Sequence, residues 1–222
     1  MEPSGRRGGR FAENRLYLAS KSYTLPDLFI IAGCNGAGKT TASFTVLPEL
    51  LQVREFVNAD EIARGLSPFQ PERVALEAGR IMLRRIDELL AQRENFAFET
   101  TLATKSFAGL IRRAAAAGYT INLIYYWLNS VELAQERVRV RVTEGGHHIP
   151  AETITRRYYA GIRNFVHLYQ QLADCWLLFD NSTTAQQLIA ESRRNGETII
   201  VSANTWNTFN QLANHDAHGN QR

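Results

Sequence analysis

The chain has 222 residues, 45% of them hydrophobic and 21% charged, a composition that excludes a disordered or fibrous protein. Its net charge of +3 comes entirely from residues 1–22, which hold five basic and two acidic side chains, so the body that follows is neutral. A neutral body argues against a nucleic-acid surface. Two cysteines exclude a disulfide scaffold, and no apolar run approaches the ~20 residues that a membrane helix needs.

Residues 1–25 show no hydrophobic period, and we expect a basic, loosely ordered tail there. No apolar segment follows its arginines, so no secretory signal is expected and the default compartment is the cytoplasm. From residue 27 onward, short apolar runs typical of strands buried on both faces alternate with amphipathic segments typical of helices. The predicted strands are residues 28–32, 54–58, 95–99, 119–128 and 175–180, and the predicted helices are residues 38–47, 71–92, 105–117, 129–142 and 150–173.

The pattern changes after residue 182. Residues 188–192 and 197–201 flank an Asn195-Gly196 pair, which is typical of a hairpin turn, and a short helix is expected near residues 205–213. We therefore predict an α/β domain at residues 26–182, with a central parallel sheet of about five strands flanked by helices, and a small extension at residues 183–222 packed on it. In such sheets, ligands bind at the carboxyl ends of the strands.

The first predicted strand runs directly into the segment GCNGAGKT, which matches the phosphate-loop pattern G-x-x-x-x-G-K-[ST] in full and predicts a P-loop NTPase fold. The glycines let backbone N–H groups wrap a phosphate, and the following helix presents its positive N-terminus to that anion. Lys39 is expected to reach the β- and γ-phosphates, and Thr40 to offer its hydroxyl to Mg²⁺. The predicted nucleotide-binding residues are Gly33, Asn35, Gly36, Ala37, Gly38, Lys39, Thr40 and Thr41.

The expected nucleotide is ATP, because the Asn-Lys-x-Asp element through which GTPases read guanine is absent from the chain. Asp60 follows the second predicted strand and therefore lies at the ligand-binding edge. A kinase needs a carboxylate that orients the attacking hydroxyl and accepts its proton, and Asp60 is the predicted general base. The alternative is that Asp60 is the N-cap of a helix that starts at Glu61.

The third predicted strand ends in Phe98-Glu99-Thr100-Thr101. Apolar residues followed by an acid are typical of a Walker B strand, whose carboxylate serves Mg²⁺ or its water. A second possibility is that Glu99 accepts a hydrogen bond from a substrate hydroxyl, with Thr101 beside it. A third is that Glu99 is a solvated residue at the end of the strand. A glutamate so close to a buried strand is costly without a partner, which favours a functional role.

Arginines gather on the two helices after the fourth predicted strand. Arg137 and Arg141 are four residues apart and share a helix face, whereas Arg139 points elsewhere. Gly145-Gly146 provides a hinge before the next helix, which carries Arg156. This layout is typical of a lid that closes arginines over a transferring phosphoryl group, and the alternative is a set of solvated arginines. The histidines at 147, 148, 215 and 218 lack partners at ligand spacing, so no metal site is expected there.

Taken together, these motifs resemble the zeta-toxin family of P-loop kinases. The resemblance runs from about residue 28 to residue 182. Its most specific parts are the Asn-Ala-Asp element, the Phe-Glu-Thr-Thr element and the arginine lid, and the segments that carry it are IIAGCNGAGKTT, FVNADEIARGLSP, AGRIMLRRIDELL, FAFETTL and RVRVRVTEGGHHIP.

The resemblance implies phosphorylation of a UDP-N-acetyl sugar, typically at the 3′-hydroxyl of UDP-N-acetylglucosamine, with ATP and Mg²⁺. It implies that Asp60 is the general base and that Glu99 and Thr101 contact the sugar nucleotide. Arg137 is the clearest match to a lid arginine, and Arg141, Arg156 or His147 is the second one. It also implies a partner, since well-known members pair with a small helical antitoxin.

The same motifs leave two other functional hypotheses open. The chain could phosphorylate another small hydroxyl compound, such as a nucleoside or an RNA end, and the arginines of the tail are the one feature that favours RNA. It could also be a non-catalytic module that binds ATP and switches a partner through lid closure. That reading predicts ATP binding without turnover of an acceptor.

Overall fold

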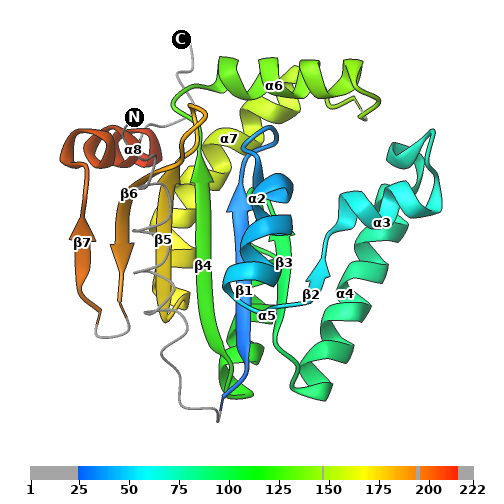
Figure 1. Cartoon of the computed structure of the whole chain (residues 1–222), viewed down its shortest axis with the longest axis horizontal. Coiled ribbons are helices and arrows are strands. Elements are labelled where there is room, and N and C mark those ends of the chain that lie inside the picture. Colours follow the sequence, from blue (N-terminus) through cyan, green and yellow to red (C-terminus); the bar gives the residue numbers. More distant parts are fainter. Residues whose placement is uncertain (1–24, 147, 194–195, 215–222) are drawn as a thin grey trace, which may run out of the picture.

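The structure, a computed structural model, describes residues 25–146, 148–193 and 196–214. The described part forms one seven-stranded sheet with the order β2-β3-β1-β4-β5-β6-β7 (Figure 1). All pairs from β2 to β5 are parallel, and β6 and β7 add to the β5 edge in antiparallel fashion. The strands are β1 (Asp27–Gly33), β2 (Glu55–Val57), β3 (Phe96–Thr100), β4 (Thr120–Trp127), β5 (Cys175–Asp180), β6 (Gln187–Ser192) and β7 (Thr198–Ile200).

The helices occupy both faces of the sheet and its upper edge. In Figure 1, α2 lies in front of β1, α5 and α7 lie behind the sheet, and α6 crosses above the carboxyl ends of the strands. The helices are α2 (Lys39–Thr45), α3 (Ala59–Leu66), α4 (Ala75–Gln92), α5 (Phe107–Ala116), α6 (Val131–Thr143), α7 (Ala151–Asn164) and α8 (Ala203–Asn214), with shorter turns at Val46–Leu50, Pro71–Val74, Phe165–Tyr169 and Gln170–Leu172.

The sequence pattern follows from this layering. All eight residues of β4 are buried, and β1 is buried from Leu28 to its end, because helices cover both faces of the sheet. The predicted α/β class with a parallel five-strand centre is confirmed. The predicted C-terminal hairpin is also present as β6 and β7, and it continues the same sheet. The predicted tail, residues 1–25, lies outside the described residues except for Leu25.

The C-terminal helix α8 closes the core on the β5 side. Phe209 of α8 is fully buried, and its ring lies between 5.7 and 5.9 Å from the rings of Tyr125, Trp127 and Phe165. Trp206, on the same helix, stacks on Trp176 at 5.9 Å. Aromatic pairs at such distances add to the free energy of burial. Residues after the hairpin are therefore part of the same hydrophobic core as the central strands.

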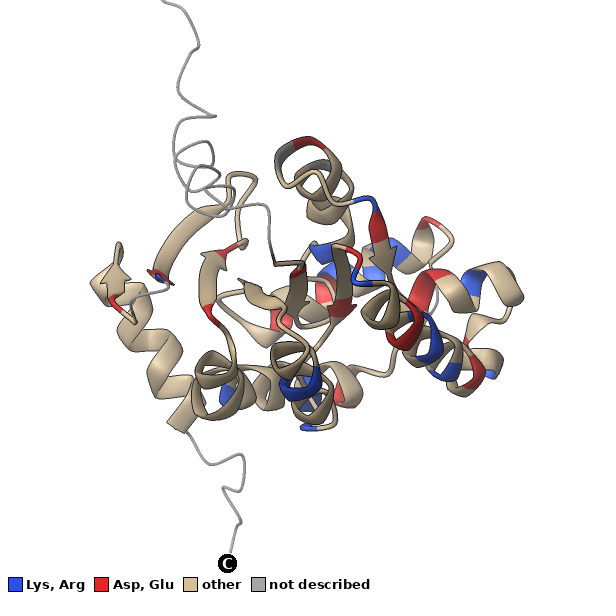
Figure 2. Cartoon of the chain, turned by 90° about the horizontal axis from the view of Figure 1, so that it is seen from below, with Lys and Arg blue, Asp and Glu red and all other residues tan. Residues whose placement is uncertain are grey.

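Charged residues of both signs are interspersed on the described body. Figure 2 shows blue and red segments alternating on α3 and α4, whereas α8 carries no Lys, Arg, Asp or Glu. Exposed pairs such as Arg113 with Asp87 and Arg85 with Glu55 account for several of these charges. None of the helices in the described ranges combines the length and the apolar composition that crossing a membrane requires.

Candidate active site

The phosphate loop joins the end of β1 to the start of α2. Gly33 and Gly38 adopt φ values of 141° and 79°, which side chains other than glycine's disfavour. A Cβ added at Gly33 would lie 2.2 Å from the carbonyl oxygen of Tyr126, and one at Gly38 would lie 2.6 Å from Nδ2 of Asn181. The loop is thus confined by the end of β4 and by the segment that follows β5.

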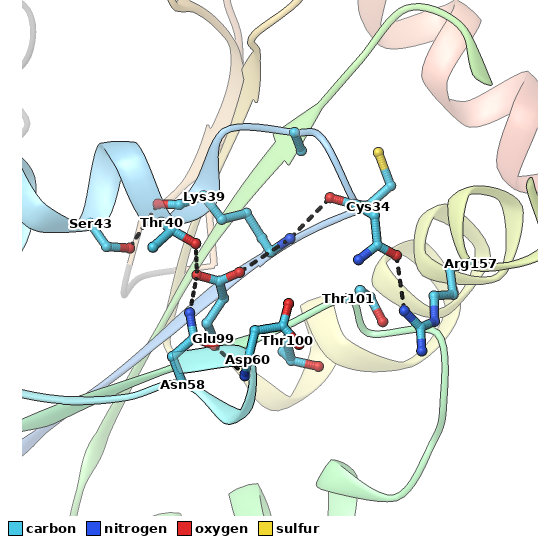
Figure 3. Close-up of polar contacts among 12 residues, drawn as sticks. Cys34, Lys39, Thr40, Ser43, Asn58, Asp60, Glu99, Thr100, Thr101 and Arg157 are labelled. Atoms are coloured by element: carbon cyan, nitrogen blue, oxygen red, sulfur yellow. Dashed lines mark hydrogen bonds and ion pairs between the residues drawn. The ribbon is translucent and has the colours of Figure 1, made fainter. Parts of the chain in front are cut away.

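Lys39 and Thr40 meet the carboxylate of Glu99 beneath this loop (Figure 3). Nζ of Lys39 donates to the carbonyl oxygen of Cys34 at 2.9 Å and lies 3.4 Å from Oε1 of Glu99. The hydroxyl of Thr40 donates to Oε2 of Glu99 at 2.7 Å. The side chains of Lys39 and Glu99 are only 6% and 9% exposed, so the two charges compensate each other in a largely dry site.

Asn58, just after β2, arranges the start of α3. It is the N-cap of this helix, and its Oδ1 accepts hydrogen bonds from the backbone N–H groups of Asp60 at 2.8 Å and Glu61 at 3.4 Å. The alternative interpretation of Asp60 as the N-cap is therefore wrong, because Asn58 fills that position. The Asp60 carboxylate is exposed and makes no hydrogen bond or ion pair with any residue in the described ranges.

The end of β3 brings two threonines to the same place. Oγ1 of Thr100 accepts from the backbone N–H of Leu102 at 3.1 Å, and Oγ1 of Thr101 accepts from that of Ala103 at 3.4 Å. Figure 3 shows Thr101 on the side of the loop toward α7, opposite Lys39 and Glu99. The Asp60 carboxylate points into the space bordered by Lys39, Thr101 and Arg157.

Arg137 of α6 holds the segment that follows β5. Its two terminal nitrogens donate to the carbonyl oxygens of Asn181 and Ser182, each at 2.9 Å. Nδ2 of Asn181 in turn donates to the carbonyl oxygen of Ala37 at 2.7 Å. In this arrangement Arg137 and Asn181 support the phosphate loop from the β5 side.

The other predicted arginines differ in their surroundings. Nε and Nη2 of Arg141 are buried and have no hydrogen-bond partner within the described part of the chain. The turn at Gly146 packs on this side chain, since a Cβ added there would lie 2.8 Å from Cγ of Arg141. Arg139, which the spacing placed on another helix face than Arg137 and Arg141, is exposed and pairs with Glu136. Arg156 is exposed, and His147 lies outside the described residues.

The remaining loop residues occupy different environments. Asn35 and Ala37 are buried, whereas Thr41 is exposed on α2. Cys34 is 2% exposed, and burial raises the pKa of its thiol to about 11. The thiol is therefore neutral at pH 7, as expected for a group beside an anionic ligand.

Three residues of this site received no individual role from the sequence, although Asn58 belongs to the Asn-Ala-Asp element. They are Asn58, Asn181 and Arg157, whose Nη1 donates to Oδ1 of Asn35 at 3.1 Å. Asn58 and Asn181 both directly follow strands, so attention to every strand end would have found them. Arg157 carried no comparable signal, because its neighbour Arg156 is an equally plausible choice until the orientation of α7 is known.

Comparisons with known proteins support the fold described above. An uncharacterised protein of Haemophilus influenzae is 31% identical over 127 residues, which are 57% of this chain and 88% of that protein. Two solved structures share the fold at low identity. The AvrRxo1-ORF1:AvrRxo1-ORF2 complex with sulphate ions has a TM-score of 0.71 and 18% identity, and the match covers 92% of this chain and 70% of that one. A structure from the PezAT toxin–antitoxin system of Streptococcus pneumoniae has a TM-score of 0.63 and 16% identity. That match covers 96% of this chain and 88% of the other.

The family comparison covers most of the chain. The sequence profile of the family described as Zeta toxin matches residues 14–204, which include the phosphate loop, Asp60, Glu99 and every predicted arginine. The resemblance seen in the sequence is therefore confirmed: the chain belongs to the zeta toxin family.

Proposed function

We propose that this protein is an ATP-dependent kinase that transfers the γ-phosphoryl group to a hydroxyl of a UDP-N-acetyl sugar. The observation that carries the proposal is the exposed Asp60 carboxylate, which has no partner among the described residues and points into the space between the phosphate loop and Thr101 (Figure 3). Membership of the zeta toxin family supports the class of ATP-dependent kinase. A related fold has been solved with ATP, in the AvrRxo1-ORF1:-ORF2 complex.

The proposed reaction is an in-line displacement. The acceptor hydroxyl gives its proton to the Asp60 carboxylate while its oxygen forms a bond to the γ-phosphorus. The bond between that phosphorus and the oxygen bridging to the β-phosphate breaks, and ADP leaves with the electron pair. Asp60 suits this role because Asn58 caps α3 in its place, which leaves the Asp60 carboxylate available for the acceptor.

The residues around Thr40 fit a magnesium ion. Because the Thr40 hydroxyl donates its proton to Glu99, the lone pairs of its oxygen stay available for a hard cation. Mg²⁺ takes few protein ligands and several phosphate or water oxygens, which matches one hydroxyl backed by a carboxylate. When bound, the ion neutralises charge on the β- and γ-phosphates. We propose that Glu99 acts on this side by orienting Thr40 and Lys39, as in the Walker B interpretation, rather than by contacting the sugar.

The predicted lid arginines divide between two roles in this proposal. Arg141 has buried donors without hydrogen-bond partners among the described residues, and a phosphate oxygen would satisfy them when the turn at Gly145-Gly146 moves. Arg137 supports the loop through the backbone of residues 181–182. Arg156 stays a prediction for the acceptor side, and so does Thr101, whose hydroxyl proton remains available for donation.

The acceptor is the part of the proposal that rests on resemblance, because the Asn-Ala-Asp and Phe-Glu-Thr-Thr elements match the family pattern. The test is mass spectrometry of purified protein incubated with Mg-ATP and UDP-N-acetylglucosamine, with Lys39→Ala as control. A sugar nucleotide heavier by one phosphoryl group, absent in the control, supports the full proposal. ATP binding without that product contradicts the acceptor assignment and directs the search to nucleosides, RNA ends or a switch role.

We also propose a protein partner of the antitoxin type. The support is that the PezAT structure comes from a toxin–antitoxin system and that the AvrRxo1-ORF1 structures contain a second open reading frame product. The test is growth of a bacterial host that expresses the wild type or Lys39→Ala. Growth arrest with the wild type alone supports a toxic kinase that needs neutralisation, and equal growth with both contradicts it.

A further inference from the structure

One face of α7 is docked on the end of β3. Nδ2 of Asn164 donates to the carbonyl oxygen of Leu102 at 2.7 Å. A Cβ added at Gly161 would lie only 2.6 Å from the carbonyl oxygen of Thr101, so the helix approaches that strand end as closely as glycine permits. Arg157, Gly161 and Asn164 have the spacing i, i+4 and i+7 and therefore share this face. The docking of α7 thus turns Arg157 toward the phosphate loop.

Arg157 has a weak partner in this position. Its one side-chain hydrogen bond to a described residue is the 3.1 Å contact from Nη1 to Oδ1 of Asn35, a neutral amide oxygen. It forms no ion pair with any residue in the described ranges, although Asp60 is close enough to affect it. Burial lowers the pKa of the Arg157 guanidinium, and the charge of Asp60 opposes that shift. A half-buried cation held by one neutral oxygen is well suited to exchange that oxygen for an anion.

We propose that Arg157 binds the γ-phosphate of ATP by leaving Asn35 Oδ1 and donating to the non-bridging oxygens of that phosphate. This inference rests on the proposed function and adds a specific residue to it. Lys39 and Arg157 approach the same space from opposite sides, Lys39 from the start of α2 and Arg157 from α7 (Figure 3). A planar guanidinium can donate two parallel hydrogen bonds to one phosphate, which an ammonium cannot. Arg157 therefore binds the phosphoryl group on the side opposite Lys39.

The same geometry separates Arg157 from its neighbour. Successive residues on a helix differ in direction by about 100°, so a helix that points Arg157 at the loop points Arg156 away. Arg156 is accordingly exposed. The structure thus favours Arg157 where the sequence pattern had favoured Arg156, and substituting each in turn separates the two predictions.

The test compares the affinities of ADP and of AMP-PNP, which retains a γ-phosphate, by isothermal titration calorimetry with Mg²⁺. The variants are Arg157→Ala, Arg157→Lys, Arg156→Ala and, as a matched exposed control, Arg139→Ala. We expect Arg157→Ala to weaken AMP-PNP binding about tenfold relative to ADP binding, since the lost hydrogen bonds join two charged groups. Arg157→Lys should recover only part of that ratio. Arg139→Ala should leave the ratio unchanged. Thermal melting confirms that each variant is folded.

The outcomes are distinguishable. A wild type that binds neither nucleotide overturns the ATP-dependent function and this inference with it. A wild type that binds both nucleotides, with a ratio that Arg157→Ala leaves unchanged, overturns the role of Arg157 alone. A ratio that falls with Arg156→Ala but not with Arg157→Ala overturns it in favour of the neighbouring residue. Because no acceptor is present, none of these results depends on the identity of the sugar nucleotide.

Discussion

Nδ2 of Asn58 donates a 2.9 Å hydrogen bond to Oε2 of Glu99, the same oxygen that accepts from Thr40. Asn58 thereby connects two strand ends, because its Oδ1 caps the helix of Asp60 while its Nδ2 fixes the carboxylate beneath the phosphate loop. The side-chain amide of Asn58 thus fixes the position of the proposed general base relative to the proposed Mg²⁺ side of the site.

This double contact gives a prediction for two substitutions at position 58. Asn58→Ala should lower the stability by about 1 kcal/mol through loss of the cap. Asn58→Asp keeps a capping oxygen but places a carboxylate against the largely buried Glu99, so charge repulsion should offset the gain from the cap and the variant should lose at least as much activity as Asn58→Ala. Thermal melting, and kcat measured with the proposed acceptor, check the two effects. If Asn58→Asp retained wild-type kcat, the hydrogen bond from Asn58 to Glu99 would not be needed for activity.

A second prediction decides the role of Glu99. Glu99→Gln removes the charge that Lys39 and Thr40 contact while it preserves the size of the side chain. We expect kcat to fall about 100-fold, with a higher Mg²⁺ requirement and an acceptor KM within about threefold of the wild type. Steady-state kinetics at varied Mg²⁺ measure this, with the exposed Glu88→Gln as control. A selective rise in acceptor KM would instead support the sugar contact that the resemblance implied.

A third prediction concerns Asn181 and the loop it supports. Asn181→Ala removes the hydrogen bond to the carbonyl oxygen of Ala37. The phosphate loop should then be less rigid where its backbone N–H groups wrap the phosphates. We expect the affinities for ATP and ADP to fall together by about tenfold, because both share the β-phosphate. AMP, which lacks that phosphate, should bind as it does to the wild type. Equal weakening of all three nucleotides, or of none, would contradict a role in shaping the phosphate site.

The fourth prediction follows from the buried thiol of Cys34. Burial raises its pKa from 9.0 to about 11, so the folded state disfavours the thiolate more than the unfolded state does. The resulting stability is fully present below pH 9 and is lost as the pH rises from 9 to 11. It amounts to roughly 3 kcal/mol, at about 1.4 kcal/mol for each of two pKa units. Urea unfolding at pH 8 and pH 10 should therefore show a larger loss for the wild type than for Cys34→Ala. Parallel losses in both proteins would assign the pH dependence to other groups.

Much of the fold was predictable because local patterns and long-range structure agree. The apolar run before Gly33 forms a strand with both faces covered, and the Asn-Gly pair near residue 195 lies between two strands that do pair with each other. The site was predictable only in part. Arg157 and Asn181 reach the phosphate loop through hydrogen bonds with residues 122 and 144 positions away, and no local period encodes such contacts. Asn58 shows a further difficulty. Asn58 and Asp60 are equally good N-cap candidates in the sequence, and only the structure shows that the Asn58 side chain caps the helix.

The packing of α8 also has a consequence for the order in which the protein becomes functional during its synthesis. A nascent chain that has emerged through residue 182 already contains the phosphate loop, Asp60, Glu99 and Arg157. It still lacks Phe209, whose ring covers Tyr125, Trp127 and Phe165 at the back of those strands. The strands that position the proposed catalytic groups therefore remain incompletely covered until α8 has left the ribosome. We expect such a kinase to lack activity during translation and to become active only after α8 has packed against the core.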